Sequence, residues 1–327
     1  MMRGAQRVQP IAGGALLMLI LVIALAAPWL GLRDPNAQPD GLVLRYLPPL
    51  TLVDTIVGSD GSVRFAHEVR SSDDGSVSYR RGERWKTLLA TELAGPDREQ
   101  WHRRAWFPLG TDGLGRDLLS RVIHGARISL LVGSVAAVLA LLLGTGVGLV
   151  AGYAGGWLDT LLMRLTDLFL SVPRLFLALL LVALYDPSIR TTIFVLGATT
   201  WMAAARLVRG QILSTREQDW VQAARALGTP PARIGLVHLL PVALVPLTVE
   251  VTLRVADTIL LEASLSFLGL GIPIPAPSWG NLIADGRNNL VDAWWISTIP
   301  GVMIAVTVIS LYLLGEAVRS RLAVARV

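Results

Sequence analysis

Residues 214–241 read STREQDWVQAARALGTPPARIGLVHLLP, a polar and basic stretch that lies between two strongly apolar runs. Ser214 followed by Glu217 fits a capping box, in which each side chain satisfies an unpaired amide of the first helical turn. Four apolar residues then recur at helical spacing and are expected to form one face: Trp220, Ala223, Ala224 and Leu227. The stretch therefore predicts a short amphipathic helix.

A second helix is predicted after a glycine turn. Gly228 stands where the first residue beyond a helix belongs, a position that favours glycine. Thr229 can cap the next helix, and Pro230 or Pro231 fits its first turn, where no amide donor is needed. The pattern is helix, glycine turn, helix, and its purpose depends on the apolar runs beside it.

Those runs indicate a polytopic membrane protein. Of the 327 residues, 53% are hydrophobic and 16% are charged, and the mean hydropathy is +0.57. Soluble domains carry about 25% charged residues, and a run of about 20 apolar residues crosses a bilayer core. We expect an all-α fold with six transmembrane helices, at 11–32, 128–153, 161–185, 191–208, 239–261 and 294–314. The first run is too long for a signal peptide, so we expect it to be retained.

The distribution of arginine orients these spans. Short cytoplasmic segments of membrane proteins are rich in arginine and lysine, which explains the net charge of +5 more simply than nucleic-acid binding does. Arginine is in excess in the amino-terminal tail, in 206–233 and in the carboxyl-terminal tail, but not in 186–190 or 272–293. We therefore predict that both termini and residues 214–233 are cytoplasmic.

Residues 33–114 are then predicted to form an extracytoplasmic insert. Turn sequences at 59–61 and 73–75 adjoin alternating stretches, which indicates short β-hairpins and a partly β insert. From 115 to 128 the apolar spacing becomes helical, as in an interfacial helix that leads into the second span. The expected division is 1–32 (cytoplasmic tail and first transmembrane helix), 33–114 (insert) and 115–327 (transmembrane helices 2–6 with a cytoplasmic loop at 209–241).

Several chemistries are excluded by motifs that the sequence lacks. Without cysteine there is no thiolate metal site or catalytic thiol, and the four histidines form no metal-binding pattern. Lys86 is the only lysine, and it does not stand in the GxxxxGK[ST] loop that binds nucleotide phosphates. Neither GxSxG nor HExxH occurs. We therefore expect no catalytic residue, no metal site, no cofactor bound by this chain, and no ATP hydrolysis by it.

Three glycines in the second run, Gly144, Gly148 and Gly152, repeat every fourth residue. This small-xxx-small spacing is typical of membrane helices that approach each other closely. We interpret the three glycines as packing residues rather than as a nucleotide-binding loop.

Ionisable residues within the predicted spans are functional candidates, because a charge in hydrocarbon is costly. The candidates are Asp167, Glu250, Arg254 and Asp257 within spans, and Glu262 at the outer end of the fifth span. Glu250, Arg254 and Asp257 share one helical face, so Arg254 can pair with either acid. Two interpretations remain open: these groups line a polar translocation path, or an internal ion pair holds the fifth span to its neighbours.

The amphipathic helix of 214–241 also allows more than one interpretation. The spans on either side exclude insertion into a DNA groove. The helix can dock into a groove on a soluble partner, or it can lie on the lipid surface.

Residues 222–228, QAARALG, followed by HLLP at 238–241, resemble the EAA loop in permease subunits of binding-protein-dependent ABC importers. The family pattern is EAA, three residues and glycine, then a fixed spacer to Leu-Pro, and the spacing from Gly228 to Leu240 and Pro241 agrees. Gln222 replaces the usual glutamate, keeping its shape but not its charge, and His238 replaces an aliphatic residue.

Other segments resemble the dipeptide/oligopeptide/nickel branch of this family, C-type subunit. They are GTD at 110–112 with GRD at 115–117, GARIS at 125–129, GYAGGW at 152–157, ARLVRG at 205–210, EASLSFLGLG at 262–271 and PSWG at 277–280. Residues 39–107 are longer than the connection expected in the family, and the resemblance does not extend to them.

The resemblance implies the ABC type I importer permease fold and a set of partners. A B-type permease would form the other half of the pathway, in the plasma or inner membrane of a bacterium or archaeon. Two ATPase subunits would use ATP and Mg²⁺, and an external binding protein would deliver di- or oligopeptides, or alternatively nickel or another small solute. Coupling to the ATPases would fall to Trp220, Gln222, Ala223, Ala224, Leu227, Gly228, Leu240 and Pro241.

An alternative of a different class is a secondary transporter that couples the charges of the fifth span to protons. It would work without ATPase partners and would leave the polar loop without a role. For 39–107 two roles remain open: contact with the binding protein or a lid over the outer gate, or a decoration that packs only on its neighbours.

Overall fold

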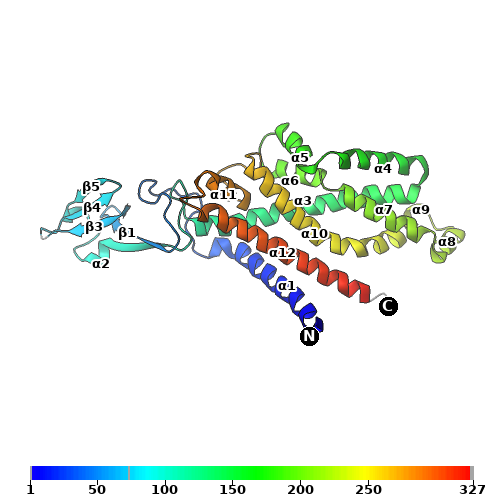
Figure 1. Ribbon diagram of the computed structural model, residues 1–327, viewed down its shortest axis with the longest axis horizontal. Coiled ribbons are helices and arrows are strands. Elements are labelled where there is room, and N and C mark those ends of the chain that lie inside the picture. Colours follow the sequence, from blue (N-terminus) through cyan, green and yellow to red (C-terminus); the bar gives the residue numbers. More distant parts are fainter. Residues whose placement is uncertain (1, 73, 325–327) are drawn as a thin grey trace. The chain divides into compact units, whose positions relative to one another are not determined.

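The computed structural model describes residues 2–72 and 74–324, and the side chains of 12–72 and 74–321. Most of this chain is helical (Figure 1). The α-helices are α1 (Met2–Ala26), α2 (Arg98–Trp101), α3 (Leu118–Ala154), α4 (Gly156–Ser171), α5 (Arg174–Ala183), α6 (Ile189–Ala198), α7 (Met202–Arg216), α8 (Asp219–Ala226), α9 (Pro231–Arg233), α10 (Leu240–Phe267), α11 (Trp279–Gly286) and α12 (Trp295–Val324). Shorter segments are the 3₁₀ helices η1 (Ala27–Trp29), η2 (Ala90–Glu92) and η4 (Arg287–Asn289), and the π-helical η3 (Ile234–Leu239).

Four helical stretches of the described chain are long and apolar enough to cross a membrane. They are Ala12–Trp29, Leu118–Ala154, Pro231–Phe267 and Trp295–Arg321. Two further pairs of helices, α4 with α5 and α6 with α7, are long and apolar enough only when each pair is taken together, and the pairs are bent by 90° and 41°. The fold is therefore that of a multi-pass membrane protein with four such helices, or up to six if each bent pair is one span.

The third predicted span, 161–185, is not one continuous helix. α4 ends at Ser171, α5 begins at Arg174, and the two meet at 90°. Pro173 disfavours helical backbone at the residue before it, and Val172 is extended, with φ −90° and ψ 129°. The predicted span 161–185 is therefore divided into two helices at this proline, to which the prediction gave no weight.

Two other boundaries also differ from the predictions. The expected interfacial helix of 115–128 is not separate, because α3 runs without a break from Leu118 to Ala154. The predicted span 191–208 is interrupted at 199–201, and α7 then continues to Arg216. α3 therefore begins before the predicted span 128–153, and α7 ends beyond the predicted span 191–208.

The glycine repeat of α3 packs against α7, as predicted. A Cβ at Gly144 would lie 2.6 Å from the Trp201 carbonyl oxygen, and one at Gly148 would lie 2.5 Å from the Ala205 carbonyl oxygen. At Gly152 it would lie 2.8 Å from Cβ of Ile212. Three successive turns of α3 thus lie directly on α7, which confirms the packing interpretation.

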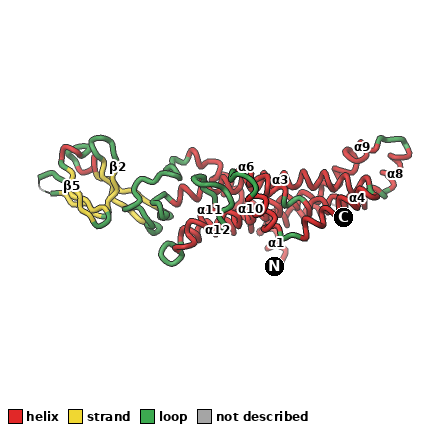
Figure 2. The backbone as a smooth tube through the Cα atoms, turned by 90° about the horizontal axis from the view of Figure 1, so that it is seen from above, coloured by secondary structure: helices red, strands yellow, loops and turns green. Residues whose placement is uncertain are grey.

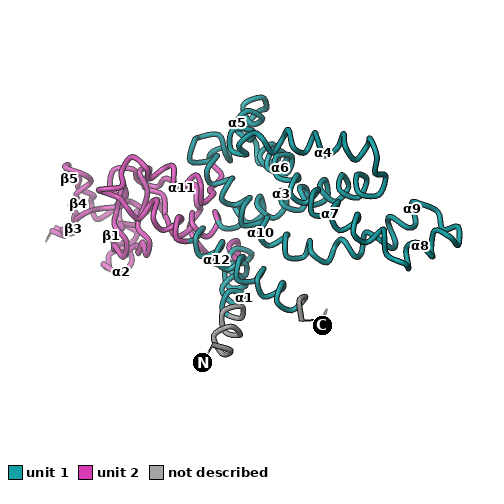
Figure 3. Tube along the Cα trace, turned by 45° about the vertical axis from the view of Figure 1, so that its right-hand side comes forward, with its two compact units in different colours: residues 1–25, 126–274, 303–327 teal, residues 26–125, 275–302 magenta. Residues whose placement is uncertain are grey.

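The described chain divides into two compact units, coloured in Figure 3. Unit 1 comprises 1–25, 126–274 and 303–327, and unit 2 comprises 26–125 and 275–302. A buried cluster in unit 1 joins α3, α7, α8, η3 and α10. Its members are Leu141, Ala204, Val208, Ile212, Val221, Ile234, Leu239, Ala243 and Leu247.

Unit 2 contains the β structure, drawn as yellow strands in Figure 2. Its strands are β1 (Thr51–Val57), β2 (Val63–Ala66), β3 (Glu68–Ser71), β4 (Val77–Arg81), β5 (Arg84–Leu88) and β6 (His102–Phe107). They form two antiparallel three-stranded sheets, in the orders β2-β1-β6 and β3-β4-β5. Side chains from both sheets share one core: Ile56, Ala66, Val77, Tyr79, Leu88, Leu93 and Trp101.

Both predicted hairpins are present, and their turns use the same chemistry. In the β1–β2 turn, Asp60 accepts hydrogen bonds from the backbone and hydroxyl of Ser62, at 2.9 and 2.6 Å. Asp74 does the same with Ser76 in the β3–β4 turn, at 2.9 and 2.7 Å. These serine hydrogen bonds hold the pKa of both carboxyls below the ordinary value. Asp73, which was part of the predicted second turn, lies outside the described residues.

A buried ion network in unit 2 links the start of α3 to α11. Asp112 is 2.6 Å from both Arg116 Nε and Arg121 Nη1, and Arg121 is 1% exposed. Asp285 of α11 contacts the same two arginines, at 3.1 and 3.5 Å. The GTD and GRD segments therefore fix the beginning of α3.

Candidate functional site

The stretch 214–241 is a set of short helices, but the first one starts later than predicted. α7 continues to Arg216, so Ser214 lies in its last turn and donates to the Gln211 carbonyl at 3.0 Å. α8 begins at Asp219, and its N-cap residue is Gln218. The predicted capping box of Ser214 and Glu217 is therefore wrong, because α7 does not end where the apolar run ends.

The predicted glycine turn is confirmed. Gly228 has φ +78°, in the left-handed region that favours glycine. Its amide donates to the Arg225 carbonyl at 2.9 Å, and the Thr229 amide donates to the Ala224 carbonyl at 3.1 Å. These two bonds form the Schellman motif that ends many helices.

The second helix of the loop begins after a proline cap. Pro230 is the N-cap of α9 and Pro231 occupies the first turn, so Thr229 does not cap it. η3 follows directly and runs into α10 at Leu240, and Pro241 stands in the first turn of α10. The second half of the loop is therefore continuous with a helix that can cross the membrane.

The two sides of α8 have different surroundings. Val221 is fully buried in the cluster that joins α3, α7, η3 and α10. Trp220 is 43% exposed and Leu227 is 86% exposed, and Ala223 is exposed as well. The predicted apolar face is therefore largely exposed in the described part of the chain, with only Ala224 half-buried, and Val221, on the other side, attaches α8 to the helices.

Polar and aromatic contacts also hold α8 against its neighbours. Gln222 Nε2 donates to the Arg216 carbonyl at 3.2 Å, a bond that a glutamate at this position could not donate. Trp220 and His238 have ring centroids 6.3 Å apart, at 75°. The Arg225 guanidinium lies 5.8 Å from the centroid of the Tyr153 ring, within cation–π range. Both residues that depart from the family pattern, Gln222 and His238, thus take part in contacts of α8.

The charges of α10 form the pairs that their spacing predicts. Arg254, which is 4% exposed, donates through Nη2 to Glu250. Its Nη1 lies 3.8 Å from Asp257 Oδ2. Asp257 also accepts from the Tyr312 hydroxyl of α12 at 3.4 Å and from Arg174 Nη1 at 3.5 Å. Asp257 therefore connects α5, α10 and α12.

The remaining two candidates lie apart from this group. Asp167 pairs with Arg206 of α7 at 2.5 Å. Glu262 is fully buried and accepts from Ser266 Oγ at 2.6 Å. Among the described residues, no group of three or more His, Asp or Glu side chains is arranged to hold a metal ion.

Two residues at this site were missed by sequence reasoning. Arg174 is the first residue of α5, and Pro173 before it is the available signal that a helix starts there. Asp159 receives two hydrogen bonds from Arg209, at 2.5 and 2.7 Å, which join α4 to α7. This pair is separated by 50 residues, so its contact cannot be read from helical spacing.

Comparison with protein families decides which group this arrangement belongs to. The family described as "Binding-protein-dependent transport system inner membrane component" matches residues 144–324, more than half of the chain. The chain belongs to this family. The matched region contains α8, the glycine turn and every ionisable candidate.

Several relatives within the family carry names. The dipeptide transport system permease protein DppC of Alkalihalophilus pseudofirmus is 38% identical over 237 residues, 72% of this chain and 76% of that protein. The oligopeptide transport system permease protein OppC of Bacillus subtilis is 39% identical, over 66% of this chain and 70% of that protein. The probable D,D-dipeptide transport system permease protein DdpC of Escherichia coli is 31% identical, over 95% of this chain and 86% of that protein.

A solved structure shares the helical fold of this family member. The structure titled "Inward facing conformations of the MetNI methionine ABC transporter" aligns with a TM-score of 0.52 at 19% identity. The alignment covers 62% of this chain and 97% of that one. At this level of identity the likeness concerns the fold alone.

Proposed function

We propose that this chain is a membrane permease subunit of an ATP-driven ABC importer and forms half of a translocation pathway for di- or oligopeptides. Family membership supports the transport role, and the names of the relatives support the peptide substrate. A second permease of the B type would form the other half. Two separate ATPase subunits would use ATP and Mg²⁺, and an external binding protein would deliver the peptide.

The observation that carries the proposal is the division of α8 into two sides. Trp220 and Leu227 are uncovered, and Val221 is fully buried among residues of α3, α7, η3 and α10. A helix with a free apolar face suits docking into a groove on a soluble partner. When that partner moves, Val221 passes the displacement to the spans. In this role the coupling residues within the loop 209–241 are Trp220, Gln222, Ala223, Ala224, Leu227, Gly228, Leu240 and Pro241.

The proposal includes a topology. Each bent pair counts as one span, which gives six, with both termini and α8 in the cytoplasm of a bacterial or archaeal cell. Arginine is concentrated in these segments, as in cytoplasmic flanks of other membrane proteins. Residues 33–114 would then lie outside the cytoplasm, where they could meet a binding protein, and 115–327 would form the permease core.

Uptake by the reconstituted importer tests the function. Proteoliposomes that contain this chain, its partner permease, both ATPases and the binding protein should accumulate labelled dialanine only with internal ATP. Replacing Leu227 with Asp should reduce uptake at least about tenfold, because a buried unpaired charge costs several kcal/mol at a docking interface. Leu290→Asp is the matched control, since Leu290 is 52% exposed and lies outside 209–241.

The results separate the proposal from its alternatives. Uptake that follows a proton gradient without ATPase subunits would contradict it in favour of a secondary transporter. ATP-dependent uptake of nickel with none of dialanine would keep the importer and change its substrate.

A further inference from the structure

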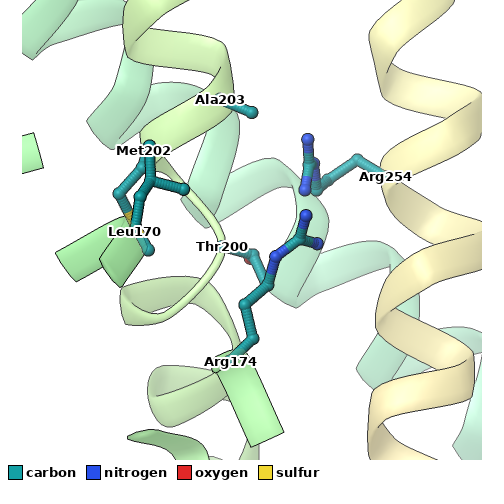
Figure 4. Close-up of a pocket in the computed structure, with 6 residues that line it drawn as sticks. All are labelled: Leu170, Arg174, Thr200, Met202, Ala203 and Arg254. Atoms are coloured by element: carbon teal, nitrogen blue, oxygen red, sulfur yellow. The ribbon is translucent and has the colours of Figure 1, made fainter. Parts of the chain in front are cut away.

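Two arginines face each other across a small cavity in unit 1. Figure 4 shows the guanidinium groups of Arg174 and Arg254 pointing toward one another from different helices. The cavity is lined by Leu170, Arg174, Thr200, Met202, Ala203 and Arg254. Arg254 comes from the middle of α10, so two cations converge within the part of the chain that spans the membrane. Such a position favours a functional role over a structural accident.

Both breaks in the bent spans lie at this cavity. Arg174 is the first residue of α5, and Met202 and Ala203 are the first two of α7. The amino-terminal end of a helix carries a partial positive charge and amides without intrahelical partners. Interrupted membrane helices use such ends to bind anionic groups of substrates. The two helix ends therefore add positive potential beside the two guanidinium groups, whose charges are balanced in this conformation by Glu250 and Asp257.

The buried arginine keeps unused hydrogen-bonding capacity. Among the described residues, no hydrogen bond reaches Nε or Nη1 of Arg254. Its strong partner is Glu250, which binds Nη2 on the other branch of the guanidinium. Asp257 is shared between Arg254 and Arg174 at 3.8 and 3.5 Å, too far for strong charge-assisted hydrogen bonds. A better-placed carboxylate could bind both arginines where Asp257 reaches them only loosely.

We propose that this cavity is a carboxylate subsite of the translocation path, which receives the carboxyl-terminal carboxylate of the transported peptide. The inference rests on the proposed function, because a peptide must be the cargo. A planar guanidinium matches a carboxylate with two parallel hydrogen bonds. The cavity is small in this conformation, so the carboxylate enters as α5, α7 and α10 separate during transport. Asp257 then exchanges its arginine partners for water and keeps its hydrogen bond from Tyr312.

Equilibrium binding to the solubilised complex, without its binding protein, tests the subsite directly. The probes are N-acetyl-dialanine and its carboxyl-terminal amide, which differ only in the carboxylate. Ligand-induced shifts of the unfolding temperature give the two dissociation constants. The wild-type complex should bind the carboxylate probe at least about tenfold more tightly than the amide, as expected for one charged hydrogen-bonding group.

Three variants and one control make the result specific. Arg174→Gln is on a half-exposed side chain and should not disturb folding. Arg254→Gln is paired with the double variant Glu250→Gln/Arg254→Gln, which leaves no buried acid unpaired. In each variant, the ratio of the dissociation constants of the amide and carboxylate probes should fall close to one. Arg206→Gln is the control, because Arg206 pairs with Asp167 and does not line the cavity, and it should keep the wild-type preference.

The outcomes distinguish the inference from the function on which it rests. Equal binding of the two probes by the wild type, or an unchanged preference in Arg174→Gln and in the double variant, would overturn the subsite. ATP-driven uptake of dialanine, measured in parallel, reports on the function separately. If dialanine is taken up but the two probes bind equally, only the proposed subsite is contradicted. If dialanine is not taken up, the proposed peptide transport is contradicted, and the subsite with it.

Discussion

Gly228 shows how much a single residue in this loop determines. Its place after the amphipathic helix predicted the turn, and the positive φ confirms it. Among the described residues, no neighbouring atom lies within 4 Å of a Cβ at Gly228, so a side chain there obstructs nothing in that part of the chain. The consequences of substitution are therefore strain in the turn and interference with a docked partner.

Gly228→Asp is expected to uncouple ATP hydrolysis from transport. A non-glycine residue in the left-handed region costs about 1–2 kcal/mol, and the carboxylate adds charge beside the docking face. Transport per ATP in proteoliposomes should fall at least about fivefold. Gly61→Asp is the control, since Gly61 also has a positive φ and open space around its Cβ position but lies in the β1–β2 turn, outside 209–241. Equal coupling in both variants would contradict the role of the turn.

The glycines of α3 provide a second test on single residues. Gly148→Ala should lower the stability of the solubilised chain by about 1–3 kcal/mol, because the new methyl group would meet the backbone of α7. Gly146→Ala should have no such cost, since no neighbouring helix or side chain in the described part of the chain comes within 4 Å of its Cβ position. Thermal unfolding of the two variants measures the difference, and similar unfolding temperatures would argue against close packing of α3 on α7.

Individual elements were predictable where one periodicity continued, and unpredictable where packing or proline interrupted it. The β1–β2 and β3–β4 hairpins and the small-residue contact of α3 followed from local patterns. The 90° break at Pro173 was missed because hydropathy continues across it. Strand β6 was missed because it pairs with β1 from about 50 residues away. The contact between Arg174 and Asp257 was missed for the same reason, because the two residues are 83 positions apart in the sequence.

The start of α3 depends on its ion network, and this can be measured. Arg121→Met leaves Asp112 and Asp285 without one of their two arginines inside a buried site, which should cost about 3–5 kcal/mol of stability. Arg127→Met, on an exposed position of the same helix, should cost little. Comparable unfolding temperatures for the two variants would show that the network does not hold α3.

The insert can be tested at the scale of the whole molecule. Thr51 and Phe107 are direct partners in the β1–β6 register, and such residues are about 4.5–5.5 Å apart. Residues 52–106 can therefore be replaced by a short glycine linker with little displacement of the flanking chain. We expect the shortened chain to copurify with the ATPases but to bind the binding protein at least about tenfold more weakly. Unchanged affinity would mean that the insert only packs on its neighbours.

Docking of α8 on an ATPase subunit is the central claim, and cysteine cross-linking tests it most directly. The natural sequence has no cysteine, so Leu227→Cys introduces a single thiol on a side chain that is 86% exposed. Val291→Cys, at a residue that is 92% exposed and predicted to lie outside the cytoplasm, is the control. In the assembled importer, a cross-linker that carries one maleimide and one photoreactive benzophenone should join Leu227→Cys, and not Val291→Cys, to the ATPase. A Leu227→Cys thiol that stays fully reactive and unlinked in the active importer would contradict the claim.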